Sequence, residues 1–189
     1  MRGTWYAFNQ YLSNQEVEGL VEECEKYPLH PSGITKNNSL VIDPNVRVTD
    51  VAMLSRGLSP RVFEEMFDWA LIANRESFGF LVDRVGEVQY GKYEAEKRSK
   101  YKWHMDTVWA NDTEYDRKLT VVVQLTDPSQ YEGGLFEFKD YTWGEEELKM
   151  VRSKGTIIVF PSFLEHRVTE VTAGTRASLV GWVEGPKFR

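Results

Sequence analysis

The chain contains very little cysteine and histidine. Among its 189 residues, Cys24 is the single cysteine and only three residues are histidines. One cysteine cannot form an intrachain disulfide and cannot supply a cluster of thiolates for zinc. We therefore expect a reducing, cytoplasmic location, where free thiols are the rule.

Long apolar runs are also missing. No stretch approaches the roughly 20 apolar residues that a transmembrane helix requires, and the segment MRGTWYAFNQYL at the start lacks the apolar core of a signal peptide. The net charge of −6 gives no general attraction for nucleic acid phosphates. A short basic run at 97–100 is more simply explained as a solvated loop. The sequence thus predicts a globular protein with neither a membrane nor a nucleic acid as partner.

Two segments in the N-terminal part have helical patterns. Ser13 followed by Glu16 is a capping-box signature, which begins a helix that we expect to run to about Lys26. A second helix is predicted over 60–78, where apolar residues recur with the helical period and Pro60 occupies the first helical position.

The part of the chain after Phe80 changes to short strand-like runs. Turn residues such as Gly133 and Gly134 separate these runs, and we expect them to be needed for backbone freedom, because glycine tolerates positive φ. Many short strands at regular spacing favour a closed jelly roll, which leaves no long sheet edge exposed. The predicted strands, with two earlier runs, are 5–11, 46–54, 86–93, 101–107, 119–126, 135–139, 156–160, 166–171 and 176–183.

The sequence therefore predicts an α+β fold, mainly β, with N-terminal helices packed on the outer sheet. No linker interrupts the chain, so 1–189 is expected to be a single domain. Within it, 1–79 would form a helical support region and 80–189 the jelly-roll core. The segment 30–38 is expected to be a loop, and the acidic run 145–147 a solvated stretch.

A candidate metal site begins with His104 and Asp106. These residues lie two apart on a predicted strand, so their side chains should share one face, with Trp103 and Met105 facing the opposite layer. His166 follows the predicted strand 156–160. Two histidines and one carboxylate match the facial triad of non-haem Fe(II) oxygenases. A pair of this kind also occurs often by chance, so a polar pair on a strand is the simpler alternative.

Arg176 adds a second feature. It lies ten residues after His166, on a predicted strand that is otherwise apolar, and Ser178 shares its face. A buried guanidinium is costly unless it has an anionic partner, and it binds a carboxylate through two parallel hydrogen bonds. A bound dicarboxylate would be such a partner.

Three segments carry a resemblance to a known family. They are the pair His104 and Asp106, the stretch RKLTVVVQLTDPSQYEGGLFEF, and the stretch KGTIIVFPSFLEHRVTEVTAGTRASLVGWV. The chain resembles the 2-oxoglutarate- and Fe(II)-dependent dioxygenases, specifically the prolyl 4-hydroxylase-like branch, over roughly 86–185. The resemblance implies a double-stranded β-helix, the cupin-like jelly roll, in which His104, Asp106 and His166 bind Fe(II). It also implies that Arg176 binds the far carboxylate of 2-oxoglutarate.

The resemblance suggests further residues around these groups. Gln124 stands where many relatives have a tyrosine that contacts the co-substrate, although an exposed strand residue is an equal alternative. Trp182 is a candidate wall of the substrate cleft, with plain core packing as the alternative, and Trp109 with the loop 110–116 is a candidate substrate cover or ordinary solvent-exposed segment. The remaining candidates for contact with 2-oxoglutarate are Tyr90, Tyr93, Tyr101 and Ser178. His30 has no partner in the sequence pattern and is expected to play no part.

The function implied by the resemblance is hydroxylation of a peptidyl or protein side chain, proline being the leading target. 2-Oxoglutarate would be decarboxylated to succinate, and ascorbate is a candidate stimulant. Asp106 argues against halogenation, because halogenating relatives lack this carboxylate. Nucleobase demethylation is disfavoured by the acidic charge and by the lack of a second arginine soon after Arg176.

Two alternatives remain open. The first is a 2-oxoglutarate dioxygenase that acts on a small molecule or a free amino acid. The second is a non-catalytic jelly-roll binding module, which would predict lost metal ligands. A cupin-like metal protein without 2-oxoglutarate would have no need of Arg176. The oligomeric state is left open by the sequence.

Overall fold

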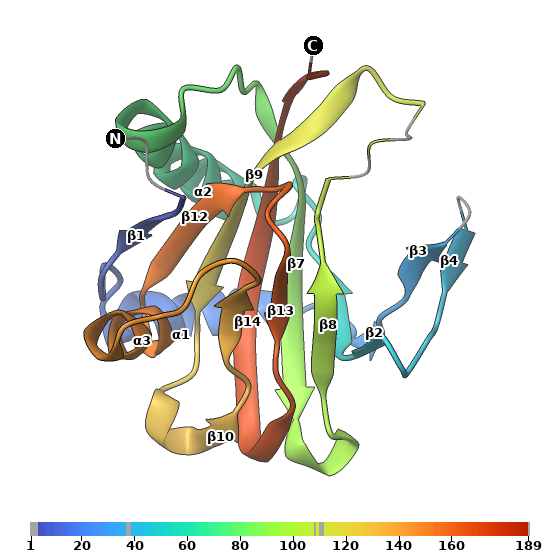
Figure 1. Cartoon of the computed structure of the whole chain (residues 1–189), viewed down its shortest axis with the longest axis vertical. Coiled ribbons are helices and arrows are strands. Elements are labelled where there is room, and N and C mark those ends of the chain that lie inside the picture. The colour runs from blue at the N-terminus through green and yellow to red at the C-terminus, as the bar shows by residue number, and fades with distance from the viewer. Residues whose placement is uncertain (1–3, 37–38, 108, 110–111, 189) are drawn as a thin grey trace.

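Two antiparallel sheets face each other across the molecule (Figure 1). The structure is a computed structural model and describes residues 4–36, 39–107, 109 and 112–188. The larger sheet has the strand order β1-β12-β9-β14-β7-β6-β2, with β10 also paired to β14, and the smaller sheet has the order β11-β13-β8-β5. This arrangement is the jelly roll that the sequence predicts.

The bounds of the elements are as follows. The larger sheet contains β1 (Tyr6–Phe8), β2 (His30–Pro31), β6 (Asp50–Met53), β7 (Arg84–Glu94), β9 (Tyr115–Gln124), β10 (Tyr131–Gly133), β12 (Ile157–Pro161) and β14 (Val171–Pro186). The smaller sheet contains β5 (Arg47–Val48), β8 (Lys100–His104), β11 (Phe136–Phe138) and β13 (His166–Val168). The hairpin β3 (Ile34–Lys36) and β4 (Ser39–Val41) projects beside β8 (Figure 1). The helices are α1 (Asn14–Cys24), α2 (Pro60–Ala73) and α3 (Glu145–Arg152), and Ala95–Lys97 and Pro128–Gln130 form 3₁₀ turns.

The larger sheet is buried on both faces. Along β9, Val121 and Val123 point toward α1 and α2, while Val122 points toward the smaller sheet. The alternation follows from the two-residue period of a strand. Because both faces are covered, residues 121–123 of β9 form a continuous apolar run without the polar alternation of a strand with one solvent-exposed face. Within the described part of the chain, no helix is long and apolar enough to cross a membrane.

The two predicted helices are present. The capping box of α1 is confirmed, since the backbone N–H of Glu16 donates to the Ser13 hydroxyl at 3.3 Å and the Ser13 N–H donates to the Glu16 carboxylate at 2.8 Å. The second helix covers the predicted range but changes type within it. It ends as an α-helix at Ala73 and continues as a π-helical turn over Asn74–Phe78. The Asn74 amide closes this turn by bonding both the N–H and the carbonyl of Phe80, each at 2.8 Å.

Several local predictions are wrong. The segment 30–38 contains β2 and β3 rather than a loop alone, and 46–54 divides into β5 and β6, which join different sheets. The acidic run 145–147 is exposed at Glu145 and Glu146, as predicted, and it also opens α3. Strand pairing depends on residues that are far apart in the sequence, so the local sequence pattern does not predict it. The first 79 residues thus contribute strands to both sheets, so the expectation of a purely helical support region is incomplete.

Gly133 ends β10 in a conformation that only glycine adopts easily. Its φ is +70°, and a Cβ there would lie 2.1 Å from the carbonyl oxygen of Glu170. Gly133→Ala is therefore expected to lower the free energy of unfolding by about 2–4 kcal/mol, because left-handed strain and a backbone clash add together. Urea unfolding followed by circular dichroism measures this change.

A matched substitution should have the opposite sign. Gly19 lies inside α1, and no described heavy atom lies within 4 Å of the position a Cβ would take. Gly19→Ala is expected to raise the free energy of unfolding by up to about 1 kcal/mol, since alanine favours the helix. Equal destabilisation by both substitutions would contradict the role assigned to the Gly133 turn.

Candidate metal centre and co-substrate pocket

Pairing of β13 with β8 brings the two site histidines together. His166 is directly opposite His104 in the register of these strands, and their ring centroids are 4.2 Å apart. β8 ends at His104, and the chain then leaves the sheet, so that the N–H of Asp106 donates to the carbonyl of Ser162 at 2.8 Å. The expectation that His104 and Asp106 share a strand face is therefore wrong. A turn held by Ser162 brings the Asp106 carboxylate to the histidines.

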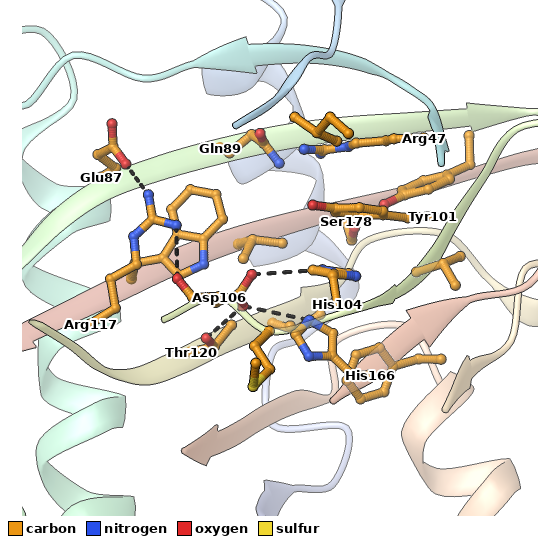
Figure 2. Close-up of a pocket in the computed structure, with 18 of the residues that line it drawn as sticks. Arg47, Glu87, Gln89, Tyr101, His104, Asp106, Arg117, Thr120, His166 and Ser178 are labelled. Atoms are coloured by element: carbon orange, nitrogen blue, oxygen red, sulfur yellow. Dashed lines mark hydrogen bonds and ion pairs between the residues drawn. The ribbon is translucent and has the colours of Figure 1, made fainter. Parts of the chain in front are cut away.

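The three side chains form a compact donor set (Figure 2). One ligand atom from each of His104, Asp106 and His166 lies within 4.8 Å of the others. Nε2 of His104 is 3.7 Å from Oδ1 of Asp106, and Nε2 of His166 is 3.5 Å from Oδ2. Two nitrogens and a carboxylate oxygen, closely grouped, are a donor set that suits Fe(II).

Hydrogen bonds behind the donor set fix its orientation. Nδ1 of His104 lies 2.7 Å from the carbonyl of Lys102, and Nδ1 of His166 lies 2.9 Å from the carbonyl of Leu164. A carbonyl can only accept, so Nδ1 carries the proton and the Nε2 lone pair of each ring faces the site. The Thr120 hydroxyl donates to Oδ2 of Asp106 at 2.7 Å.

The protonation states also suit a metal. Burial lowers the pKa of His104 to about 3, and the neighbouring His166 adds to this effect, so the ring is neutral near pH 7. Burial alone would raise the pKa of Asp106, but His166, His104 and Arg117 together with the Thr120 hydrogen bond hold it below its usual value. A neutral imidazole and an ionised carboxylate are the forms that bind metal ions.

A cavity of about 460 Å³ opens beside this donor set, between the two sheets. One part of its wall is apolar and includes Val122, Phe136 and Val168, whereas polar and charged lining side chains come from β5, β7, β8, β9, β13 and β14. Of the sequence candidates, those that line the cavity are His104, Asp106, His166, Arg176, Ser178, Tyr93, Tyr101 and Trp182.

Arg176 has the strongest signature of a missing anionic partner. Its side chain is on β14 and the residue is only 1% exposed. Nη2 donates to Oε1 of Gln124 at 3.0 Å, but Nη1 has no hydrogen-bond partner among the described residues. A buried donor without a partner is costly. A carboxylate in the cavity would satisfy it, so the residues present fit 2-oxoglutarate.

Gln124 acts through Arg176 rather than on the cavity itself. It is buried and is not among the lining residues; its Nε2 donates to the carbonyl of Val151 at 2.8 Å while its Oε1 accepts from Arg176. The alternative of an exposed strand residue is wrong, and direct contact with the co-substrate is not supported. Gln124 instead fixes the direction of the guanidinium.

Tyr90 is a misassigned candidate. Tyr90 and Tyr93 are both on β7, but they are an odd number of residues apart and point to opposite faces. Tyr93 lines the cavity, and the Arg176 guanidinium lies 5.3 Å from its ring centroid. Tyr90 is buried in the cluster that packs the sheet against the helices. The strand alternation therefore excludes Tyr90 from the co-substrate site.

The two candidate tryptophans also differ, since one lines the cavity and the other does not. Trp182 lines the cavity, with the Arg117 guanidinium 4.1 Å from its ring centroid, and its buried Nε1 has no hydrogen-bond partner in the described part of the chain. Trp109 is 57% exposed, packs against Phe188, and does not line the cavity. Residues 110 and 111 of the predicted covering loop lie outside the described residues.

Trp103 and Met105, which were expected to face the layer opposite the metal ligands, are not packed in such a layer. Met105 is 44% exposed and lines the cavity, and Trp103 is at the surface under the guanidinium of Arg167. Because the strand ends at His104, the alternation rule no longer applies at Met105.

Sequence reasoning missed five polar residues that line the cavity: Arg47, Glu87, Gln89, Arg117 and Thr120. Arg47 is on β5, Gln89 on β7 and Arg117 on β9 (Figure 2). Arg47 and Gln89 are each flanked by apolar or aromatic strand residues, and an isolated polar residue in such a run is a signal that could have identified them. Arg117 stands between Asp116 and Lys118 and has no such signal. Whether such a polar residue points into a cavity or into solvent depends on the sheet pairing.

Known proteins share this chain's sequence pattern and fold. A PKHD-type hydroxylase of Prochlorococcus marinus is 33% identical over 116 residues, which are 61% of this chain and 49% of the relative. A second, from a Synechococcus strain, is 35% identical over 89 residues, 47% of this chain and 38% of the relative. The chain thus spans about half or less of the length of these relatives.

Solved structures agree in fold. A prolyl-4-hydroxylase of Pseudomonas putida has a TM-score of 0.70 at 22% identity, with 97% of this chain and 93% of that chain covered. A prolyl hydroxylase of Trichoplax adhaerens, in complex with a peptide fragment of hypoxia inducible factor, has a TM-score of 0.70 at 15% identity, with 95% and 83% covered. HygX of Streptomyces hygroscopicus, with nickel, 2-oxoglutarate and hygromycin B bound, has a TM-score of 0.62 at 17% identity, with 98% and 84% covered. These similarities establish the double-stranded β-helix fold.

The family follows from a sequence model. The model of the 2OG-Fe(II) oxygenase superfamily matches residues 88–184, just over half of the chain. The matched segment runs from β7 to β14 and contains the donor set and Arg176. The chain belongs to the 2OG-Fe(II) oxygenase superfamily.

Proposed function

We propose that this chain is an Fe(II)- and 2-oxoglutarate-dependent dioxygenase that hydroxylates a peptidyl or protein side chain, with proline as the favoured target. The observation that carries the proposal is the Nη1 of Arg176, which lacks a hydrogen-bond partner among the described residues and lies in the same cavity as the donor set of His104, Asp106 and His166. A metal site and a carboxylate site in one cavity are what a chelating keto acid requires.

Each protein group has a definable part in this reaction. His104, Asp106 and His166 would hold the iron, and Thr120 keeps the Asp106 carboxylate in place. Arg176, directed by Gln124, would fix the far carboxylate of 2-oxoglutarate. When bound, iron and 2-oxoglutarate would activate O₂, with one oxygen atom used to convert 2-oxoglutarate to succinate and CO₂ and the other delivered to the substrate as the new hydroxyl group. The apolar part of the cavity wall keeps water from the reacting groups.

Support for a peptide substrate comes from the relatives. The two curated relatives are named PKHD-type hydroxylases, and two structures of the same fold are named prolyl hydroxylases, one of them in complex with a peptide. The alternative is a small-molecule or free amino acid substrate. One structure with this fold, HygX, has the small molecule hygromycin B bound, and a cavity of about 460 Å³ has the size typical of small-molecule sites.

An inactive binding module is the non-enzymatic alternative. It would have no need to keep three metal-binding side chains and an unpaired arginine together, because buried charged groups are costly unless they are used. The proposal treats 1–189 as one dioxygenase domain. A cytoplasmic location and stimulation by ascorbate are parts of the proposal that rest on the sequence expectation alone.

The direct test uses the purified chain with Fe(II), ascorbate and 2-oxoglutarate. We expect succinate formation that rises when a proline-containing peptide is hydroxylated, and a mass gain of one oxygen atom in that peptide by mass spectrometry. A panel of free amino acids, tested in parallel, separates the two substrate classes. Absence of 2-oxoglutarate binding to the Mn(II)-loaded protein in calorimetry would defeat the enzyme assignment altogether.

A further inference from the structure

Arg47 is a buried cation without an anion. It is on β5 at the edge of the smaller sheet, is only 8% exposed, and lines the cavity. Its Nε has no hydrogen-bond partner, and no carboxylate of the described residues forms an ion pair with it. Its guanidinium is stacked 4.4 Å from the ring centroid of Tyr101.

The other cavity arginines differ from Arg47. Arg117 forms an ion pair with Glu87, and Arg176 bonds Gln124 and faces the ring of Tyr93. Among the described residues, the contact found for the Arg47 guanidinium is the aromatic one. Its Nε is buried without an acceptor, which is destabilising, so its retention in this cavity points to an acceptor that arrives with a ligand.

The position of Arg47 is next to the metal centre. The Tyr101 ring on which it is stacked is itself stacked on His104, with ring centroids 3.4 Å apart. In Figure 2 the Gln89 amide from β7 points toward the Arg47 guanidinium, above the group formed by His104 and Asp106. Gln89 is buried as well. An amide N–H₂ and a guanidinium together form a suitable site for a carboxylate.

The balance of charges in the cavity also indicates an anionic partner for Arg47. Its charged residues are Arg47, Glu87, Asp106, Arg117 and Arg176. Glu87 and Arg117 neutralise each other. With Fe(II) and the 2-oxoglutarate dianion bound, the charges of the metal, the dianion, Asp106 and Arg176 cancel. Arg47 is then the one uncompensated charge among the lining residues, and a single negative charge on the substrate would balance it.

We propose, building on the function proposed above, that Arg47 with Gln89 binds a carboxylate of the substrate and so selects substrates that carry a carboxylate next to the hydroxylated position. The carboxylate has two sources, which are the α-carboxylate of a free amino acid and the side chain of an acidic residue beside the hydroxylated residue in a peptide. In both cases Arg47 holds the substrate next to the donor set without taking part in the chemistry, so it is a residue that determines specificity.

The experiment compares matched acid and amide ligands. The first pair is L-proline and L-prolinamide. The second is a capped tetrapeptide with glutamate after proline and its glutamine counterpart. Binding of each is measured by calorimetry to protein loaded with Mn(II) and 2-oxoglutarate, which cannot turn over. In at least one pair the acid is expected to bind about 10- to 100-fold more tightly than the amide, the range of a charge-assisted hydrogen bond.

Variants separate a charge effect from a structural effect. Arg47→Gln should remove the preference by weakening the acid alone, while Arg47→Lys should keep part of it. Arg84→Gln is the matched control, because Arg84 pairs with Glu184 and does not line the cavity, and it should keep the full preference. Succinate formation with the same ligands should follow the same order.

Three results would overturn the assignment of Arg47. The first is equal binding of acid and amide in both pairs. The second is an acid preference that Arg47→Gln leaves unchanged. The third is that Arg47→Gln lowers the affinity for 2-oxoglutarate as much as it lowers the affinity for the acid ligand. 2-Oxoglutarate binding by the wild-type protein is measured first. If that binding is present and acid preference is absent, the role of Arg47 fails while the dioxygenase proposal stands; if that binding is absent, the dioxygenase proposal itself fails.

Discussion

Replacement of His104 with alanine is expected to weaken Mn(II) binding by more than about 100-fold and to abolish succinate formation. Loss of a hydrogen-bonded residue behind a metal ligand already costs about 10- to 100-fold in metal affinity or activity, and His104 is itself part of the donor set with Asp106 and His166. Calorimetry with Mn(II) gives the affinity, and succinate formation from 2-oxoglutarate gives the turnover.

The third histidine of the chain provides the control. His30 is exposed on β2 and lies outside the cavity. His30→Ala removes an imidazole of the same kind and should leave both metal affinity and turnover unchanged. Circular dichroism checks that His104→Ala remains folded, since the ring of His104 is stacked on Tyr101. A folded His104→Ala protein with normal metal affinity would refute the proposed iron site.

Arg176→Lys is expected to raise the 2-oxoglutarate concentration needed for half-maximal rate by about 10- to 100-fold, with Mn(II) affinity unchanged. Lysine keeps the charge but loses the planar fork that bonds Gln124 and a carboxylate at the same time. A hydrogen bond to a charged group contributes about 1.5–3 kcal/mol, which corresponds to this range. Initial rates over a series of 2-oxoglutarate concentrations measure the change.

A matched lysine substitution tests whether the effect belongs to this position. Arg61 is on the outer side of α2, its side chain is 82% exposed, and it pairs with Glu65. Arg61→Lys should leave the 2-oxoglutarate requirement unaltered. Equal losses of Mn(II) affinity and of 2-oxoglutarate affinity in Arg176→Lys would contradict its role, because the arginine would then support the whole site and not the co-substrate alone.

The sequence by itself determined the local elements and the chemical types of the site. The capping box at Ser13 and Glu16 lies within one turn, so its signal is complete in the sequence. The apolar period of α2 is also local. Only the change to a π-helical turn after Ala73, which the Asn74 side chain closes on Phe80, was not predicted. Residue type and a family sequence pattern identified four site residues, which are His104, Asp106, His166 and Arg176. Both kinds of information are present in the sequence and need no coordinates.

The tertiary structure alone decided which of the remaining candidates share the cavity. Tyr90 and Tyr93 are equivalent as sequence signals, and the pairing of β7 between β14 and β6 sends one to the core and the other to the cavity. Asp106 reaches the histidines through a turn held by Ser162, far away in sequence. Arg47 meets Tyr101 only because the short β5 pairs with β8. The physical reason is common to all three: strand pairing joins distant segments, and its register sets the direction of every side chain, whereas the local sequence specifies only that a strand is present.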